Sequence, residues 1–318
     1  MRRRLLLAVP SLLAAPAIAQ PRGPIRLLVG FAPGGTADQV ARIAAEAIQR
    51  RGGPSVIVEI RSGALGFIAL QAVARSPADG TTLGIGIMGQ LAVAPVVPGS
   101  QIPLDLDREL APIAALATTP MALVVRPDAP FRTVAELVAE ARARPAGALT
   151  YGSTGNGSTN QLGAEGFAVA AGLKLTHVAY RGGAPALLDL AAGRIDLFFA
   201  NIAEVAEMVR GGQVRALALA ADAPLALFPD LPLLTADYPS LAMGNWFGLV
   251  GPAGLLEGQQ AELAALFLDA LADPVTTPVL AARGLLPLGE AGPAFAARIR
   301  RDRERWAQVA KAGNIRAD

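Results

Sequence analysis

Short apolar runs alternate with amphipathic segments along most of this chain. Residues 25–29 and 56–60 form apolar runs typical of buried strands, and residues 37–50 between them show the helical spacing of apolar positions. This alternation of strand and helix predicts an α/β protein in which mostly parallel sheets are flanked by helices on both faces. Continued along the chain, it predicts further strands at 82–88, 123–125, 175–180, 195–199 and 214–220, and helices at 67–75, 133–143, 158–171, 184–192, 203–210, 259–271 and 295–312.

The alternation is interrupted twice, and the interruptions divide the chain into two lobes. One break lies at 125–130 and the other at 229–246, a stretch rich in proline and turn residues. About 300 mature residues exceed the ordinary size of one compact core, which favours two domains. We therefore expect one lobe from residues 20–124 and 244–318 and a second from residues 125–243. Two crossings make a hinge, and a cleft between lobes joined in this way can close on a ligand.

A glycine turn follows the first predicted strand. Pro33, Gly34 and Gly35 allow the backbone to turn sharply without bulky side chains. The free N–H groups and the positive dipole end of the next helix then face open space, which suits a small anion. Asp38, in the first helical turn, either interacts with that dipole or contacts the site loops or a ligand amino group. The candidate binding residues are Phe31, Ala32, Pro33, Gly34, Gly35, Thr36 and Asp38.

A second loop of the same design spans residues 151–160, in the other predicted lobe. Its glycines allow close backbone approach, its hydroxyl groups can donate hydrogen bonds, and Ser158 or Thr159 can cap the next helix. An ordinary capped Gly/Ser loop is the alternative interpretation, but the repeat of one design in opposite lobes favours a binding role. The candidates are Ser153, Thr154, Gly155, Gly157, Ser158, Thr159 and Asn160.

A third turn, at residues 180–183, also precedes a predicted helix. Its arginine, Arg181, either clamps an anionic ligand or lies solvated on the surface, and the residues leave both interpretations open. Side chains elsewhere are expected to select the rest of the ligand. The candidate set is completed by Arg181, Gly182 and Gly183 of this turn and by Gln90 and Asn201.

The N-terminus has the composition of a signal peptide. Arginines at 2–4 precede a short apolar run at 5–17 and the small-x-small cleavage site Ala17-Ile18-Ala19, which leaves Gln20 as the first mature residue. A membrane anchor is the alternative, but the run is shorter than the ~20 residues that span a bilayer and contains two prolines. We expect residues 1–19 to be removed and the mature protein to be soluble in the periplasm. The arginines leave both general and twin-arginine export open.

Charge and composition exclude several classes of function. The chain has 28 basic and 26 acidic residues, and removal of the three N-terminal arginines leaves 25 against 26, so a nucleic-acid partner is not expected. Cysteine is absent, which excludes disulfides, thiolate metal sites and cysteine nucleophiles. Residues 155–160 lack the last glycine of a dinucleotide-binding motif, and a Gly-x-Ser-x-Gly elbow is absent. The one histidine, His177, lies in a predicted strand where a structural role is favoured, so we expect no enzyme activity, cofactor or metal.

Several segments follow one another in a characteristic order: GFAPGGTADQVAR, VEIRSGALGFIA, LTYGSTGNGSTNQLGAE, LTHVAYRGGAPALLDLAAGRIDLFF, WFGLVGPAG and RWAQVAKAGNI. Together with the signal peptide, they resemble the tripartite tricarboxylate transporter family of periplasmic substrate-binding receptors, of the Bug type. The resemblance implies a two-lobed Venus-flytrap fold of type II. It also implies that a small organic carboxylate is held between the lobes, largely by backbone N–H groups and ordered waters, and is delivered to a membrane permease by a monomeric receptor.

Carried onto this chain, the resemblance places the carboxylate at residues 31–36 and 153–159. Asp38 and the turn at 181–183 match family positions around the site, and His177 matches a strand histidine that is usual in the family. The resemblance leaves two partners open for the closed form, a permease or a membrane sensor kinase. An exported enzyme that uses the Ser/Thr-rich loop is disfavoured, because no base with a partner accompanies that loop.

The sequence departs from the family pattern near the expected pocket. Leu65-Gly66 stands where the family has a glycine pair, Gln161 where it has histidine, and Ala200 where aspartate is frequent before Asn201. The anion-binding loops are kept while the far part of the pocket is altered. A carboxylate is therefore expected, but the sequence does not indicate which one.

Overall fold

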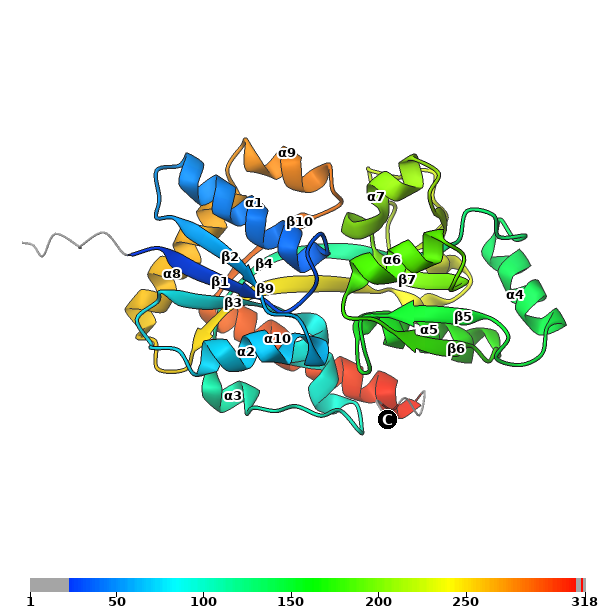
Figure 1. The fold of residues 1–318 in the computed structure, drawn as a ribbon, viewed down its shortest axis with the longest axis horizontal. Coiled ribbons are helices and arrows are strands. Elements are labelled where there is room, and N and C mark those ends of the chain that lie inside the picture. Colours follow the sequence, from blue (N-terminus) through cyan, green and yellow to red (C-terminus); the bar gives the residue numbers. More distant parts are fainter. Residues whose placement is uncertain (1–22, 313–315, 317–318) are drawn as a thin grey trace, which may run out of the picture.

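The structure is a computed structural model that describes residues 23–312 and 316, so the predicted signal peptide at residues 1–19 lies outside the described residues. Helices and strands alternate through most of the chain (Figure 1). The strands are β1 (Ile25–Val29), β2 (Val56–Ile60), β3 (Thr82–Ile87), β4 (Leu110–Val125), β5 (Thr150–Ser153), β6 (Thr176–Ala179), β7 (Leu197–Asn201), β8 (Arg215–Ala220), β9 (Gly244–Pro252) and β10 (Leu286–Ala291). The helices are α1 (Thr36–Arg50), α2 (Phe67–Ala74), α3 (Leu106–Glu109), α4 (Val134–Ala143), α5 (Thr159–Ala171), α6 (Gly183–Ala191), α7 (Ile202–Arg210), α8 (Glu257–Leu271), α9 (Thr276–Ala281) and α10 (Gly292–Ala312).

Strand β4 belongs to both halves of the molecule. Its residues 110–120 pair antiparallel with β9 and β10, and its residues 121–125 pair antiparallel with β7 and β8. Here the first lobe means β1–β3, β9, β10 and residues 110–120 of β4, and the second lobe means β5–β8 and residues 121–125, each with its flanking helices (Figure 1). The change of strand partners falls between Pro120 and Met121. The sequence-based lobe boundaries at 124 and 243 stay a prediction.

The sheet of the first lobe has a helical layer on each face. Side chains alternate along β1, so that Leu27 shares a buried cluster with Val40 of α1, while Leu28 shares another with Phe67 of α2. The first cluster includes residues of α8 and the second includes Phe295 of α10. Helices α1 and α8 therefore cover one face, and α2 and α10 cover the other. Strands buried on both faces explain the continuous apolar runs in the sequence.

The second lobe repeats this architecture. Strand β5 pairs in parallel with β6 and β7. Phe199 of β7 belongs to the same buried cluster as Phe167 of α5, and the neighbouring Phe198 packs in a cluster with Leu187 of α6 and Val205 of α7. The consequence is that the N-termini of α5, α6 and α7 follow directly after strands of one sheet, which is where ligands bind in open α/β folds.

The two-lobed α/β fold was predicted correctly, and the helices and strands of the βα units begin and end within a few residues of the predicted ranges. Three strands differ from the prediction. The strand expected at 123–125 is the end of the 16-residue β4, and β9 and β10 were not predicted. Strand β1 pairs in parallel with β2 and β3, and β5 pairs in parallel with β6 and β7, whereas β4 and β9 pair antiparallel with their neighbours. Within residues 23–312, no helix is both long and apolar enough to cross a membrane.

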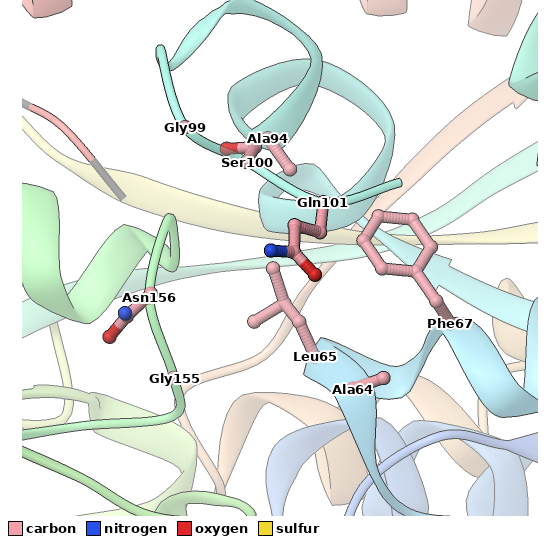
Figure 2. A pocket seen from close by; sticks show the side chains of 9 residues that line it. All are labelled: Ala64, Leu65, Phe67, Ala94, Gly99, Ser100, Gln101, Gly155 and Asn156. Atoms are coloured by element: carbon pink, nitrogen blue, oxygen red, sulfur yellow. The ribbon is translucent and has the colours of Figure 1, made fainter. Parts of the chain in front are cut away.

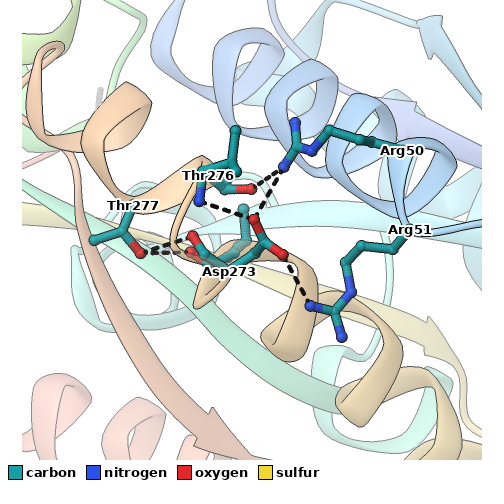
Figure 3. Close-up of polar contacts among 7 residues, drawn as sticks. Arg50, Arg51, Asp273, Thr276 and Thr277 are labelled. Carbon is teal, nitrogen blue, oxygen red and sulfur yellow. Dashed lines mark hydrogen bonds and ion pairs between the residues drawn. The ribbon is translucent and has the colours of Figure 1, made fainter.

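Helix α1 is anchored at its C-terminal end to the start of α9 and the turn before it. Arg50 Nη2 donates to Thr276 Oγ1 at 2.6 Å, and Arg51 Nη1 donates to Asp273 Oδ2 at 3.1 Å (Figure 3). The hydrogen bond from the Val275 backbone N–H, together with the two arginines, keeps the pKa of Asp273 below its ordinary value. These contacts hold the helix whose other end carries the first glycine turn.

Candidate functional site

The first glycine turn is held in shape by its own helix. Gly34 N donates to Asp38 Oδ2 at 2.9 Å, and the other oxygen of this buried carboxylate pairs with Arg42 Nε at 2.8 Å. Asp38 is thus used within the turn and the first turns of α1. Phe31, Gly35 and Thr36 are buried and face the second lobe, whereas Pro33 and Gly34 are exposed.

A carboxylate of the protein itself lies at the N-terminus of α1. Thr36 donates to Glu204 Oε1 from its backbone N at 3.0 Å and from its Oγ1 at 2.7 Å. Asn201 Nδ2 donates to the same Glu204 oxygen at 3.2 Å and to Thr36 Oγ1 at 3.0 Å. Because Glu204 and Asn201 come from the second lobe, these bonds join the two lobes at the predicted anion-binding turn.

The third turn approaches the first at the level of the backbone. A Cβ atom at Gly182 would lie 3.1 Å from Ala32 N, and one at Gly183 would lie 1.8 Å from Glu204 Oε2. Only glycine therefore fits at residue 183 while Glu204 keeps its position. Arg181 is exposed, and within the described residues it forms no hydrogen bond or ion pair.

Side chains accept hydrogen bonds from two backbone N–H groups of the second loop. Gly155 N donates to Ser153 Oγ at 3.0 Å, and Gly157 N donates to Gln161 Oε1 at 2.7 Å. Ser158 caps α5 by accepting a bond from Gln161 N at 3.3 Å, as predicted from the sequence. These contacts shape the loop, and a ligand role for its residues stays a prediction.

Two members of the second loop reach the space between the lobes. Thr154 Oγ1 donates to Asn160 Oδ1 at 2.7 Å, and Asn160 Nδ2 donates to Phe199 O at 2.7 Å. Thr159 Oγ1 accepts a bond from Asn245 Nδ2 of the first lobe at 3.3 Å. Thr154 and Asn160 line a cavity of about 20 Å³, the inner cavity, whose wall also includes Phe31, Gly35, Thr36, Gly183, Asn201, Glu204 and Asn245.

A larger cavity adjoins the inner one. This outer cavity of about 220 Å³ is formed by Gly30, Phe31 and residues 63–66 of the first lobe and by Thr154, Gly155 and residues 179–181 of the second. Phe31 and Thr154 line both cavities, so the two spaces meet at these residues. Tyr180 lies in the outer wall, where burial and its hydrogen bond to Asp189 raise its pKa to about 12.

The loop at 63–66 separates the outer cavity from a third space. Ala64 and Leu65 have positive φ angles of 48° and 52°, a conformation that costs energy for residues other than glycine and that clusters at binding sites. Figure 2 shows Leu65 pointing toward Gln101, with Gly155 and Asn156 of the second lobe across the gap. The third space, of about 420 Å³, thus also lies between the lobes.

Gln90, one of the side chains predicted to select the ligand, lies in the interior of the first lobe. It is fully buried, its Oε1 accepts a bond from Ile87 N at 3.0 Å, and its Nε2 has no hydrogen-bond partner in the structure. A Cβ atom at Gly66 would lie 2.5 Å from that nitrogen. Gln90 therefore packs against the loop at 63–66 from the protein interior. Its contact with a ligand stays a prediction.

His177 is packed against the loop as a neutral ring. Its Nε2 lies 2.6 Å from Ser153 Oγ, and the ring stacks on Tyr151 with centroids 5.0 Å apart. Burial lowers the pKa of His177 below its ordinary value. This arrangement fits the structural role inferred from the sequence.

The pH dependence of stability should report on His177. We expect the melting temperature of the wild type to fall more steeply than that of His177→Gln as the pH drops below about 6.5. Because the folded pKa is depressed, the stabilisation is complete above the unfolded pKa and is lost as the pH falls through the folded value. The chain has one histidine, so thermal scans of both proteins between about pH 5 and 7 isolate its effect. Parallel curves would contradict this prediction.

Sequence reasoning missed three residues of this region. Glu204, Asn245 and Leu65 are not among the candidate binding residues that the sequence predicts. The departure from the family's glycine pair did mark Leu65, but nothing local marked Glu204, because its partner Thr36 is 168 residues away. Among the described residues, no group of three or more His, Cys, Asp or Glu side chains could hold a metal ion.

Two α/β lobes thus meet at three glycine turns and enclose the inner and outer cavities between them. The family model described as "Tripartite tricarboxylate transporter family receptor" matches residues 40–315. The chain is 30% identical to Protein BugT of Bordetella pertussis over 306 residues, which cover 94% of this chain and 92% of BugT. The chain therefore belongs to the tripartite tricarboxylate transporter receptor family, of the Bug type.

Solved structures show the same fold with ligands named in their descriptions. A Rhodopseudomonas palustris protein described as "Rpa4515 with adipate" has a TM-score of 0.89 and 31% identity, covering 93% of this chain and 99% of that chain. MatC from Rhodopseudomonas palustris, described with bound malate, has a TM-score of 0.84 and 27% identity, covering 91% and 99% respectively.

Proposed function

We propose that this chain captures a small organic carboxylate between its lobes and delivers it to a membrane permease of the tripartite tricarboxylate transporter type. One observation supports this most directly: the outer cavity is bounded by loops of both lobes and by the exposed cation Arg181. A carboxylate there can pair with the guanidinium and with loop N–H groups, and closure strengthens such charge-assisted bonds by excluding water. The family relatives that hold adipate and malate support the same ligand class.

Thermal unfolding of the protein from Gln20 onward tests the ligand class. The panel contains mono-, di- and tricarboxylates, aromatic acids and amino acids. A ligand at about 100 times its Kd should stabilise the protein by about 2.7 kcal/mol. Arg181→Gln should weaken binding about tenfold, since it removes the charge that pairs with the carboxylate. Arg132→Gln, at an exposed residue of the second lobe, is the matched control.

The outcome is decisive in both directions. A selective shift with particular carboxylates of the panel, reduced by Arg181→Gln and kept by Arg132→Gln, supports the proposal. A protein that refolds after denaturation, free of carried-over ligand, and still responds to no carboxylate would contradict it. Uptake of the labelled ligand by cells with and without this chain then tests delivery to a permease.

A further inference from the structure

We propose that Glu204 converts the first-lobe end of the cleft from a carboxylate site into an ammonium site. The ligand would then carry a protonated amine at one end and a carboxylate at the other. This inference rests on the proposed function, because it assigns the ligand carboxylate to the outer cavity.

The first step is that the anion position of α1 is already filled. The N-terminal N–H of Thr36 and the Thr36 hydroxyl both donate to Glu204 Oε1, at 3.0 and 2.7 Å. A helix N-terminus stabilises one negative charge placed there. A second carboxylate, from a ligand, would meet the Glu204 carboxylate at short range, and such like-charge contacts cost several kcal/mol when solvent is excluded.

The second step is that the inner cavity presents unpaired acceptors. Glu204 Oε2, Asn201 Oδ1 and Asn245 Oδ1 are buried without a hydrogen-bond partner in the structure, and all three residues line the inner cavity. Asn201 is 5% exposed and Asn245 is 3% exposed. Buried acceptors without partners are costly, and a donor-bearing ligand group would satisfy them.

The orientation of Asn201 follows from its neighbours. Its Nδ2 donates to both Glu204 Oε1 and Thr36 Oγ1, at 3.2 and 3.0 Å. The opposite orientation of the amide would place its oxygen against the Glu204 carboxylate. The free atom of Asn201 is therefore the oxygen, an acceptor, and it lines the cavity beside a carboxylate oxygen.

The third step is size and charge. The inner cavity of about 20 Å³ holds one water-sized group, which is the size of an ammonium head. An ammonium has three donors and no acceptor, so it matches three acceptor oxygens and the charge of Glu204. The outer cavity of about 220 Å³, with Arg181 in its wall, lies on the other side of Phe31 and Thr154 and takes the rest of the ligand with its carboxylate.

Matched compounds test this assignment. Each ω-amino acid with two, three or four methylenes is compared with the α,ω-dicarboxylate that has the same number of methylenes, by isothermal titration of the mature protein. The wild type should bind the best ω-amino acid at least about tenfold more tightly than its matched dicarboxylate. Glu204→Gln keeps the shape of the side chain and removes its charge, so the preference should disappear. Glu207→Gln, on the same helix and 83% exposed, should keep it.

Each result has a distinct meaning. Preference of the wild type for dicarboxylates, or a preference for amino acids that survives Glu204→Gln, would overturn the ammonium site while leaving the carboxylate receptor intact. Binding of neither series, while another carboxylate of the panel binds, would likewise overturn the ammonium site alone. Binding of no carboxylate at all, to the wild type or to Glu204→Gln, would overturn the carboxylate site itself, and this inference with it.

Discussion

Gly183→Ala is expected to weaken binding of the tightest carboxylate ligand about 100-fold, which corresponds to about 2.8 kcal/mol. The new methyl group would lie 1.8 Å from Glu204 Oε2, so the Glu204 side chain must leave its position. Leaving breaks its bonds with Thr36 N, Thr36 Oγ1 and Asn201 Nδ2. The two bonds to Thr36 join the lobes, and hydrogen bonds to a charged group contribute about 1.5–3 kcal/mol each. The open form of the protein should then be more populated. Because only the closed form holds the ligand tightly, the apparent affinity falls in proportion to the population of the closed form.

A double-mutant cycle separates this effect from a general disturbance of α6. The three atoms nearest to the added methyl group all belong to Glu204. In the Glu204→Ala background, Gly183→Ala should therefore change the Kd less than about twofold. Gly258→Ala, on α8 where a Cβ atom would meet nothing within 4 Å, is the control in the wild type. Titration calorimetry gives the affinities, and small-angle scattering reports opening as a larger radius of gyration. An equal loss of affinity in both backgrounds would contradict the role assigned to Glu204.

The sequence predicted the βα units well because their signals are local. Strand β1 and helix α1 were recognised from an apolar run, a glycine turn and a helical period within about 25 residues. Strand β4 was predicted only at its end, since Pro112, Pro120 and a run of alanines obscure the pattern of its first 13 residues. Its partners β9 and β10 lie more than 100 residues later, and no local signal announces such pairing.

The candidate site shows the same division between local and distant information. The Ser158 cap and the Asp38 contact to Gly34 follow from residues three or four positions apart, and both kinds of contact can be anticipated from the sequence. The bond between Thr36 and Glu204 cannot, because it depends on how the two lobes meet. That distant contact is also the one that alters the expected chemistry. The family resemblance predicts the anion-binding turns. It does not predict which side chains of the other lobe face these turns, and those side chains determine whether an anion can bind there.

The ammonium site that we propose therefore needs no change in fold. The loops that carry N–H groups are held by backbone geometry and by anchors such as Asp273, which contacts the far end of α1 (Figure 3). Glu204 instead lies in the first turn of α7, on a helix whose packing does not depend on that side chain. One substitution at residue 204 can therefore change the charge of the cleft without disturbing the packing of α7.

Phe295→Ala is expected to lower the free energy of unfolding by about 3–5 kcal/mol, as large-to-small changes of a buried phenylalanine do. Phe295 is fully buried at the start of α10, with its ring edge-on to Trp246 at a centroid distance of 5.2 Å. It packs so closely on β9 that a Cβ atom at Gly248 would lie 2.1 Å from the ring, so little space is available for collapse. The loss is measured as a lower urea midpoint with an unchanged m value.

The control for Phe295→Ala is Val275→Ala, a residue 60% exposed, which should change stability by less than about 0.5 kcal/mol. Phe295 lines neither the inner nor the outer cavity, so the folded variant should keep its ligand affinity within about threefold. A loss of affinity with normal stability would instead mean that α10 acts on the cleft, through the segment that holds Gln90. Arg303 Nε of α10 donates to Leu91 O at 2.8 Å, which is the contact that such coupling would use. If Phe295→Ala lowers the free energy of unfolding by less than about 1 kcal/mol, the close packing of this ring on β9 is contradicted.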